Sequence, residues 1–181
     1  MQATFVVHVE DRPGVLNRVS SLVRRRGYNI ESLTVGRTET PGLSRMTIVV
    51  DTDESAVARL HANLDKLVNV RRVEDVTSAA SVVRDLAMIK VTATAETRSQ
   101  IMQLADVFRA RVVDVAPDSL VIEITGTEDK VDGLLEMLRP YGVLEMARTG
   151  RVAMVRGAGS RTTNGDARDV EASGEAIAYS V

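Results

Sequence analysis

The sequence predicts an α+β protein in which two βαββαβ units follow one another and a disordered tail ends the chain. Three observations lead to this prediction. The same order of strand and helix patterns occurs twice, a small polar break separates the two copies, and large apolar residues almost disappear after Gly157. With 181 residues, 44% of them hydrophobic, the chain is long enough for two small domains. We therefore expect domains at residues 1–77 and 82–156 and a disordered tail at residues 157–181.

The first unit begins with a strand at Thr4–Glu10, where apolar residues alternate with others as along a half-buried strand. The Asp11-Arg12-Pro13-Gly14 turn ends this strand, and a helix with one apolar stripe follows over about Val15–Arg26. Gly27 provides the stop of that helix. The remaining elements are strands at Asn29–Arg37 and Ser44–Val50, a helix at about Glu54–Leu67 and a last strand at Val70–Val76. This order is the split βαβ arrangement of ferredoxin-like folds.

The second unit repeats this order after a small polar linker at Thr77–Ser81. Its expected elements are a strand at Leu86–Thr94, a helix near Thr97–Arg109, strands at Val112–Val115 and Leu120–Thr125, a helix at about Glu128–Leu138 and a strand at Val143–Thr149. Val152–Val155 is a further strand candidate at the end of the unit. We therefore expect two ferredoxin-like domains in tandem.

Composition excludes several classes of function. No run approaches the roughly 18 apolar residues that a membrane helix needs, so we expect no membrane association. A net charge of −2 and an aromatic content of 3% provide neither a basic face nor a base-stacking surface, so we expect no nucleic-acid partner. The absence of cysteine fits a cytoplasmic location and excludes thiolate metal sites. With two histidines, His8 in a strand pattern and His61 on a polar helix face, we expect no histidine metal site.

No pattern of residues predicts catalysis. The sequence lacks a nucleophile–base grouping, a phosphate-binding loop and a zinc-protease motif. Asp51 and Asp53 are a candidate pair of carboxylates, but Thr52-Asp53-Glu54 opens a helix, where capping and acidic residues are expected. The run Gly126–Asp129 has the same role at a later helix. We therefore predict no catalytic residue and no metal site.

The Asp11-Arg12-Pro13-Gly14 turn is the first candidate binding feature. Pro13 suits the start of a helix, and Gly14 has no side chain to keep a ligand away from the backbone. The N–H groups of Val15 and Leu16 then point out of the helix N-terminus, which favours an anion such as the carboxylate of an amino acid. Asp11 is placed to meet an ammonium group. An ordinary strand-to-helix turn with Asp11 as a cap explains the same residues.

The second candidate feature is the run from Gly27 to Leu33, which enters the second strand. Asn29 can bond a ligand or cap the turn, and the residues alone leave both roles open. We expect this run to lie at the same end of the unit as the Asp11–Gly14 turn. If two units pair edge to edge, the turn of one can face the Asn29 strand of the other.

These segments resemble a known family. The D-R-P-G turn followed by V-L-N-R-V is similar to the signature of ACT domains, small amino-acid-binding regulatory modules of βαββαβ topology. Further runs, in order along the chain, resemble the small subunits of acetolactate synthase: Arg26–Val35, Leu43–Ile48, Leu64–Val70, Phe108–Ala110, Val113–Val115, Thr125–Thr127 and Glu145–Gly150. The resemblance covers about Ala3 to Gly157, with one local departure, Asp11, where some small subunits carry asparagine.

The resemblance implies a regulatory subunit that activates a separate acetolactate-forming transferase and mediates its feedback inhibition. It implies a homodimer of paired ACT domains that binds a branched-chain amino acid, valine or alternatively leucine or isoleucine, at the interface. Thiamine diphosphate, Mg²⁺ and FAD are then expected on the large catalytic subunit and not on this chain. The implied effector-binding residues are Asp11, Gly14, Val15 and Leu16 of one chain with Asn29 and Ile30 of the other.

Three other functions compete with this interpretation. A free-standing ACT-type sensor that controls another enzyme, transport or transcription explains the first unit equally well, but not the matching second half. RNA binding on a ferredoxin-like sheet requires an aromatic strand motif and a basic face, which the sequence lacks. A small ferredoxin-like enzyme such as an acylphosphatase requires loop chemistry that is also missing.

Overall fold

The computed structural model describes residues 1–157, and the two tandem βαββαβ units are confirmed there. The predicted disordered tail, from residue 158 onward, lies outside the described residues. The elements of the first unit are β1 (Gln2–Glu10), α1 (Val15–Arg25), β2 (Asn29–Arg37), β3 (Leu43–Asp51), α2 (Glu54–Asp65) and β4 (Val70–Asp75). Those of the second unit are β5 (Ser81–Thr92), α3 (Arg98–Val107), β6 (Arg111–Val115), β7 (Ser119–Gly126), α4 (Glu128–Leu138), the 3₁₀ turn η1 (Arg139–Tyr141), β8 (Val143–Arg148) and β9 (Val152–Val155).

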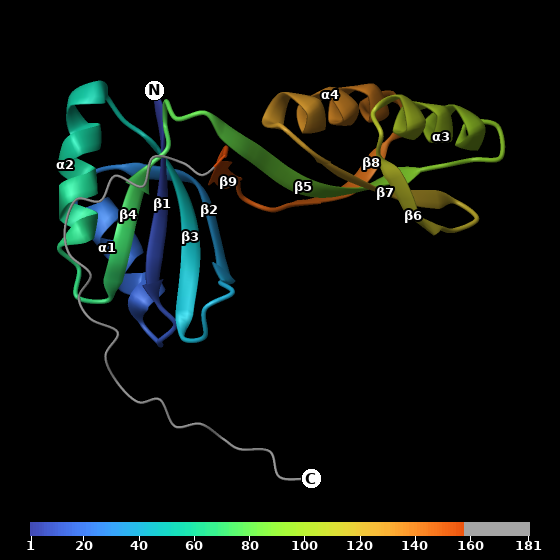
Figure 1. Ribbon diagram of the computed structural model, residues 1–181. Helices are drawn as coiled ribbons and strands as arrows, with labels where there is room; N and C mark the ends of the chain where they lie inside the picture. The colour runs from blue at the N-terminus through green and yellow to red at the C-terminus, as the bar shows by residue number, and fades with distance from the viewer. Residues whose placement is uncertain (158–181) are drawn as a thin grey trace, which may run out of the picture.

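Each unit is an antiparallel sheet with two helices on one face (Figure 1). The strand order is β2-β3-β1-β4 in the first sheet and β6-β7-β5-β8 in the second. Burial alternates along β5 from Asp85 onward, whereas β1 is buried on both faces from Ala3 to Val7. The side chains of Phe5, Val7 and Val9 in β1 point toward α1 and α2, and Ile89 and Val91 in β5 point toward α3 and α4. The two cores are therefore separate, one beneath each helix pair.

Local signals set the ends of the first two helices. Gly27, with a φ of 79°, follows the end of α1, and basic Arg24 and Arg25 occupy its last turn. Asp53 caps α2, as predicted, because its carboxylate accepts a hydrogen bond from the Ala56 N–H at 2.8 Å. These signals define the end of α1 and the start of α2.

Helix α4 departs from the capping prediction. Thr127 occupies the N-cap position with extended backbone, but its side chain makes no capping hydrogen bond. Glu128 and Asp129 nevertheless supply the acidic first turn that the sequence predicts.

The start of one strand in the second unit differs clearly from the prediction. Strand β5 begins at Ser81 and not at Leu86, because its first residues pair with β9, in the register Ser81 to Val155 and Arg84 to Val152. Strand β9 therefore does not extend the edge of the second sheet. Its Ala153 instead packs against the first unit, in a small cluster with Val6 and Val76, and so links the two units.

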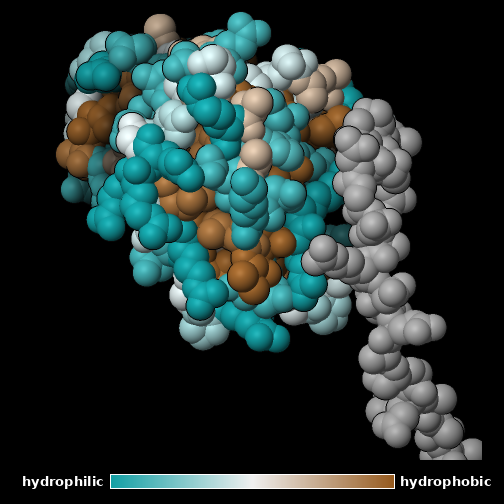
Figure 2. Space-filling model, turned by 90° about the vertical axis from the view of Figure 1, so that its left-hand side faces the viewer, coloured by the Kyte–Doolittle hydropathy of each residue, from teal (hydrophilic) through white to brown (hydrophobic). Residues whose placement is uncertain are grey.

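The surface is mixed in character. Figure 2 views the molecule from the side of α1 and α2 and shows several separate apolar patches among hydrophilic residues. Leu16 at the start of α1 is 43% exposed, and Val68, just after α2, is 88% exposed. Within residues 1–157, no helix is long and apolar enough to cross a membrane.

Candidate functional site

The turn between β1 and α1 has the backbone geometry that an anion site needs. Gly14 is the N-cap of α1 and adopts a left-handed conformation, with a φ of 84°. Within residues 1–157 no side chain caps this helix, and its first turn contains no acidic residue, in contrast to α2. At this positive helix end the Val15 N–H donates only a long hydrogen bond, of 3.4 Å, to the Arg12 carbonyl oxygen. A carboxylate could replace that acceptor and is favoured there.

The side chains around this turn divide between the core and the surface. Val15 is buried and anchors the start of α1, whereas Leu16 is nearly half exposed. The Asp11 carboxylate lies 3.2 Å from Nε of Arg37, in a pair whose side chains are 39% and 86% exposed. Such an exposed ion pair contributes little to stability, so an ammonium group can replace the arginine at small cost.

Beside the turn, Glu10 holds the end of β1 in place. Its carboxylate accepts a hydrogen bond from the Asn69 amide at 2.8 Å and pairs with Arg71 at 2.5 Å. The Asn69 hydrogen bond, helped by Arg12 and Arg71, lowers the pKa of Glu10. Glu10 therefore stays charged, and its contacts with Asn69 and Arg71 fix the end of β1 from which the turn starts.

Asn29 lies at the opposite end of the sheet from this turn, so the expectation that both share one end was wrong. In the strand pairing, Asn29 and Gln2 both align with Asp51, whereas Glu10 aligns with Leu43 and Arg37 with Ser44. The reason is that α1 returns the chain to the end where β1 began. Asn29 and Arg37 are eight residues apart on β2, or about 27 Å in an extended strand.

Strand β2 forms one edge of the first sheet, and in the described residues its outer side pairs with no other strand. Asn29 is exposed, and its amide donates to the Glu31 carboxylate at 2.5 Å. Ile30 is half-buried against the core, and a bulge follows between Ile30 and Ser32. The predicted effector residues thus fall into two groups within one chain, the turn at one end and the start of an open edge strand at the other, which we call the candidate half-sites.

The remaining candidates for chemistry have structural roles. His8 lies 3.4 Å from the Glu74 carboxylate, and burial lowers its pKa. His61 lies 3.1 Å from the Val73 carbonyl oxygen. Asp51 faces the N-terminal amine at 3.3 Å. Among residues 1–157, no group of three or more His, Cys, Asp or Glu side chains could hold a metal ion.

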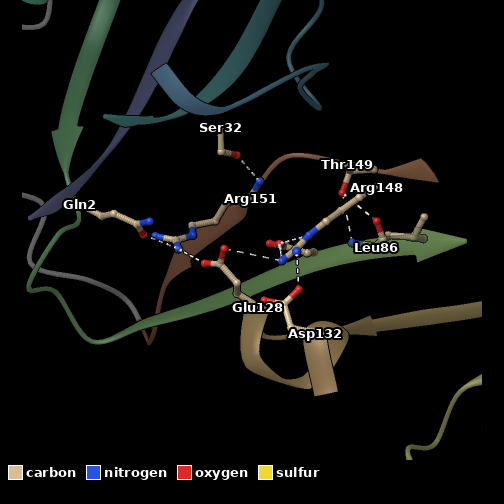
Figure 3. A network of polar contacts seen from close by, with 9 residues as sticks. Gln2, Ser32, Leu86, Glu128, Asp132, Arg148, Thr149 and Arg151 are labelled. Atoms are coloured by element: carbon tan, nitrogen blue, oxygen red, sulfur yellow. Dashed lines mark hydrogen bonds and ion pairs between the residues drawn. The ribbon is translucent and has the colours of Figure 1, made fainter. Parts of the chain in front are cut away.

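The structure also reveals a polar cluster that the sequence did not predict, between the two units (Figure 3). Arg148 in β8 bonds Asp85 at 2.5 Å and Asp132 at 2.8 Å. Arg151, just before β9, bonds Glu128 at 3.0 Å. Asp85, Glu128, Arg148 and Arg151 border a cavity of about 360 Å³, which Glu31 and Ser32 of β2 also line.

This polar cluster has no signal in the sequence, because its members come from three distant stretches of the second unit and from β2. Burial lowers the pKa of Arg148, but the hydrogen bond and the charge of Asp85, together with Asp132 and Glu128, outweigh that effect and raise it. The arginine is thus held charged by three carboxylates.

Comparison with known proteins identifies the same two units. Residues 5–72 match the family described as the AHAS small subunit-like ACT domain, and residues 84–157 match the small subunit of acetolactate synthase. The probable acetolactate synthase small subunit of Archaeoglobus fulgidus is 53% identical over 157 residues, which are 87% of this chain and 98% of that protein. The acetolactate synthase small subunit of Mycolicibacterium smegmatis is 51% identical, over 85% of this chain and 91% of that one.

A solved structure agrees with these sequence matches. The acetolactate synthase small subunit of Thermotoga maritima superposes with a TM-score of 0.81 at 39% identity, over 87% of this chain and 98% of that one. The relatives are thus matched over nearly their whole lengths, through both units. The chain belongs to the acetolactate synthase small subunits, the regulatory subunits of that enzyme, and carries their ACT domain.

Proposed function

We propose that this chain activates an acetolactate-forming catalytic subunit and makes it subject to feedback inhibition by valine, or alternatively by leucine or isoleucine. The observation that carries this proposal is the uncapped N-terminus of α1 beside the left-handed Gly14. A free amino acid offers a carboxylate for that helix end. The chain belongs to a family of small subunits of acetolactate synthase, and this membership implies a separate catalytic subunit as its partner.

The effector site is completed by a second copy of the chain. The two half-sites lie about 27 Å apart in one chain, so a single small ligand cannot touch both. Antiparallel pairing of two β2 edges would place Asn29 of each copy beside the Arg37 end of the other, next to its Asp11–Gly14 turn. The same pairing would satisfy the open backbone groups of β2. We therefore assign a homodimer with two equivalent effector sites.

Within each site the ligand groups have separate partners. The carboxylate accepts hydrogen bonds from the N–H groups of Val15 and Leu16, at the positive end of α1. The ammonium group takes the place of Arg37 at the Asp11 carboxylate. The aliphatic side chain lies between the exposed part of Leu16 and Ile30 of the second copy.

The chemistry of the reaction belongs to the catalytic partner. The partner condenses two pyruvates to acetolactate, or pyruvate with 2-oxobutyrate, and the thiamine diphosphate, Mg²⁺ and FAD that we expect are bound there. This chain contributes the effector sites and the contact that raises the partner's activity, and we place this complex in the cytoplasm.

Reconstitution tests the proposal. The rate of acetolactate formation by the catalytic subunit is measured alone, with this chain, and with this chain plus valine, leucine or isoleucine. We expect the chain to raise the rate and valine to lower it again. A catalytic subunit that is indifferent to the chain, or one that is activated but insensitive to all three branched-chain amino acids, would contradict the corresponding part of the proposal.

The site should select its ligand by the size of the side chain. Valine has two more carbons than alanine, and burying each contributes about 0.8 kcal/mol, so valine should bind at least about tenfold more tightly. Isothermal calorimetry of the full chain with valine, alanine and glycine measures the difference. Equal affinities for alanine and valine would show that no apolar pocket closes over the ligand.

A further inference from the structure

The backbone of the second unit lies in close contact with β2, the strand that carries the proposed effector residues Asn29 and Ile30. Gly150 lies so close to β2 that an added Cβ would be 2.6 Å from Oγ of Ser32 and 2.9 Å from the carbonyl oxygen of Leu33. The next residue, Arg151, donates its backbone N–H to Oγ of Ser32 at 2.7 Å. The segment that joins β8 to β9 therefore cannot stay in place if this part of β2 moves.

The side chain of Arg151 extends this contact to both units (Figure 3). Its guanidinium donates to Gln2 at 3.0 Å and Thr4 at 3.2 Å, both in β1 of the first unit. It also bonds the Glu128 carboxylate at 3.0 Å, in the first turn of α4. Only 18% of this side chain is exposed, so solvent screens its contacts weakly. One side chain thus ties the start of β1 to a helix of the other unit.

Glu128 in turn belongs to the polar cluster around Arg148. One oxygen of its carboxylate faces Arg151, and the other lies 3.9 Å from Arg148. Arg148 also bonds Asp132, one turn further along α4, and Asp85 in β5. A displacement of Arg151 is therefore transmitted to α4 and to the central strand of the second sheet.

The contact of Gly150 and Arg151 with Ser32 lies next to the proposed effector residues. Ser32 is two positions beyond Ile30, and the irregularity in the pairing of β2 with β3 falls between them. A bulge interrupts the regular ladder, so the strand can adjust there more easily than in a regular stretch. A ligand that binds Asn29 and Ile30 would thus contact β2 two residues away from Ser32, where the second unit contacts the same strand.

We propose that Arg151 is a positioning residue for β2, and that its ion pair with Glu128 couples occupancy of the effector site to the placement of the second unit. This inference rests on the proposed function, because it assumes that an amino acid binds at the start of β2. An effector changes an equilibrium only through contacts that differ between two states. We assign the contact of Arg151 with Glu128 as the one that differs between the effector-bound and the effector-free state.

Two matched substitutions on α4 test the coupling in the reconstituted enzyme. Glu128→Gln removes the charge that faces Arg151. Asp132→Asn removes a carboxylate one turn away that bonds Arg148 but not Arg151. Both keep the size of the side chain, and both residues are about half exposed, so the chain should fold in either case. The catalytic rate is recorded against valine concentration, and valine binding to the free regulatory chain is measured by calorimetry.

We expect Glu128→Gln to raise the valine concentration for half inhibition by about 5- to 150-fold, the usual range of allosteric coupling. Activation without valine and valine binding to the free chain should stay as in wild type, and Asp132→Asn should behave as wild type throughout. A purely structural role would instead weaken valine binding and inhibition together.

Three results would overturn the coupling. They are wild-type inhibition in Glu128→Gln, equal losses in both variants, or a loss of valine binding in Glu128→Gln that matches its loss of inhibition. Failure of the proposed function looks different, because the wild-type chain itself would then fail to bind valine or to respond to it.

Discussion

Gly14→Asp abolishes inhibition by valine and leaves activation of the catalytic subunit in place; this is the largest functional effect that we expect. The new carboxylate stands at the helix end where we propose that the ligand carboxylate binds. Two like charges a few ångströms apart at the mouth of a site cost about 1–4 kcal/mol, which weakens binding at least about fivefold. At the upper end of this range binding weakens several hundredfold, so the site stays empty and inhibition should vanish at ordinary valine concentrations.

The fold should tolerate this substitution. A Cβ at Gly14 would meet no atom within 4 Å, and aspartate is favourable at a helix N-terminus. The left-handed φ of 84° costs a non-glycine residue about 1–2 kcal/mol, and aspartate and asparagine tolerate it best. Gly14→Asn is therefore the matched control, since it has the same size and the same backbone strain without the charge.

Catalytic rate against valine concentration, with the partner enzyme present, distinguishes the outcomes. Gly14→Asn should keep more valine sensitivity than Gly14→Asp, and both should activate the partner. Full valine sensitivity in Gly14→Asp would remove the turn from the effector site. Loss of activation would show that the turn also contacts the catalytic subunit.

Arg148→Met should produce the largest loss of stability among the changes considered. Asp85 is 6% exposed, and one of its oxygens already lacks a hydrogen-bond partner. Without Arg148 its charge is buried and uncompensated. Breaking a buried pair costs about 3–5 kcal/mol, and because the Arg148 side chain is 23% exposed we expect about 2–4 kcal/mol. Urea unfolding of the full chain, followed by circular dichroism, measures this change.

Two further variants make this prediction specific. Arg139→Met removes an arginine whose pair with Glu136 is exposed on both sides, so it should change the free energy of unfolding by less than about 1 kcal/mol. Combining Asp85→Asn with Arg148→Met should restore much of the loss, because no buried charge remains. If Arg148→Met costs no more than Arg139→Met, the buried pair does not stabilise the second unit.

Much of the first unit could be predicted from local patterns. Alternation along Thr4–Glu10 identified a strand, and the apolar stripe that follows identified a helix ending before Gly27. The cap at Asp53 was readable because capping depends on a side chain and a backbone N–H only three residues apart. The Asp11–Gly14 turn was recognised as a candidate anion site for the same reason, since its geometry follows from adjacent residues.

The sequence by itself therefore determined the order of the elements, their amphipathic faces and the residue types at the two candidate half-sites. Only the tertiary structure decided which ends come together. Asn29 was expected beside the turn and lies at the far end of the sheet, because α1 returns the chain to the end where β1 began and β2 starts from there. The hydrogen bond from Arg151 to Ser32 joins residues 119 positions apart, and no local pattern in the sequence marks such a pair. Contacts of this kind depend on how the two sheets pack, which only the folded chain specifies.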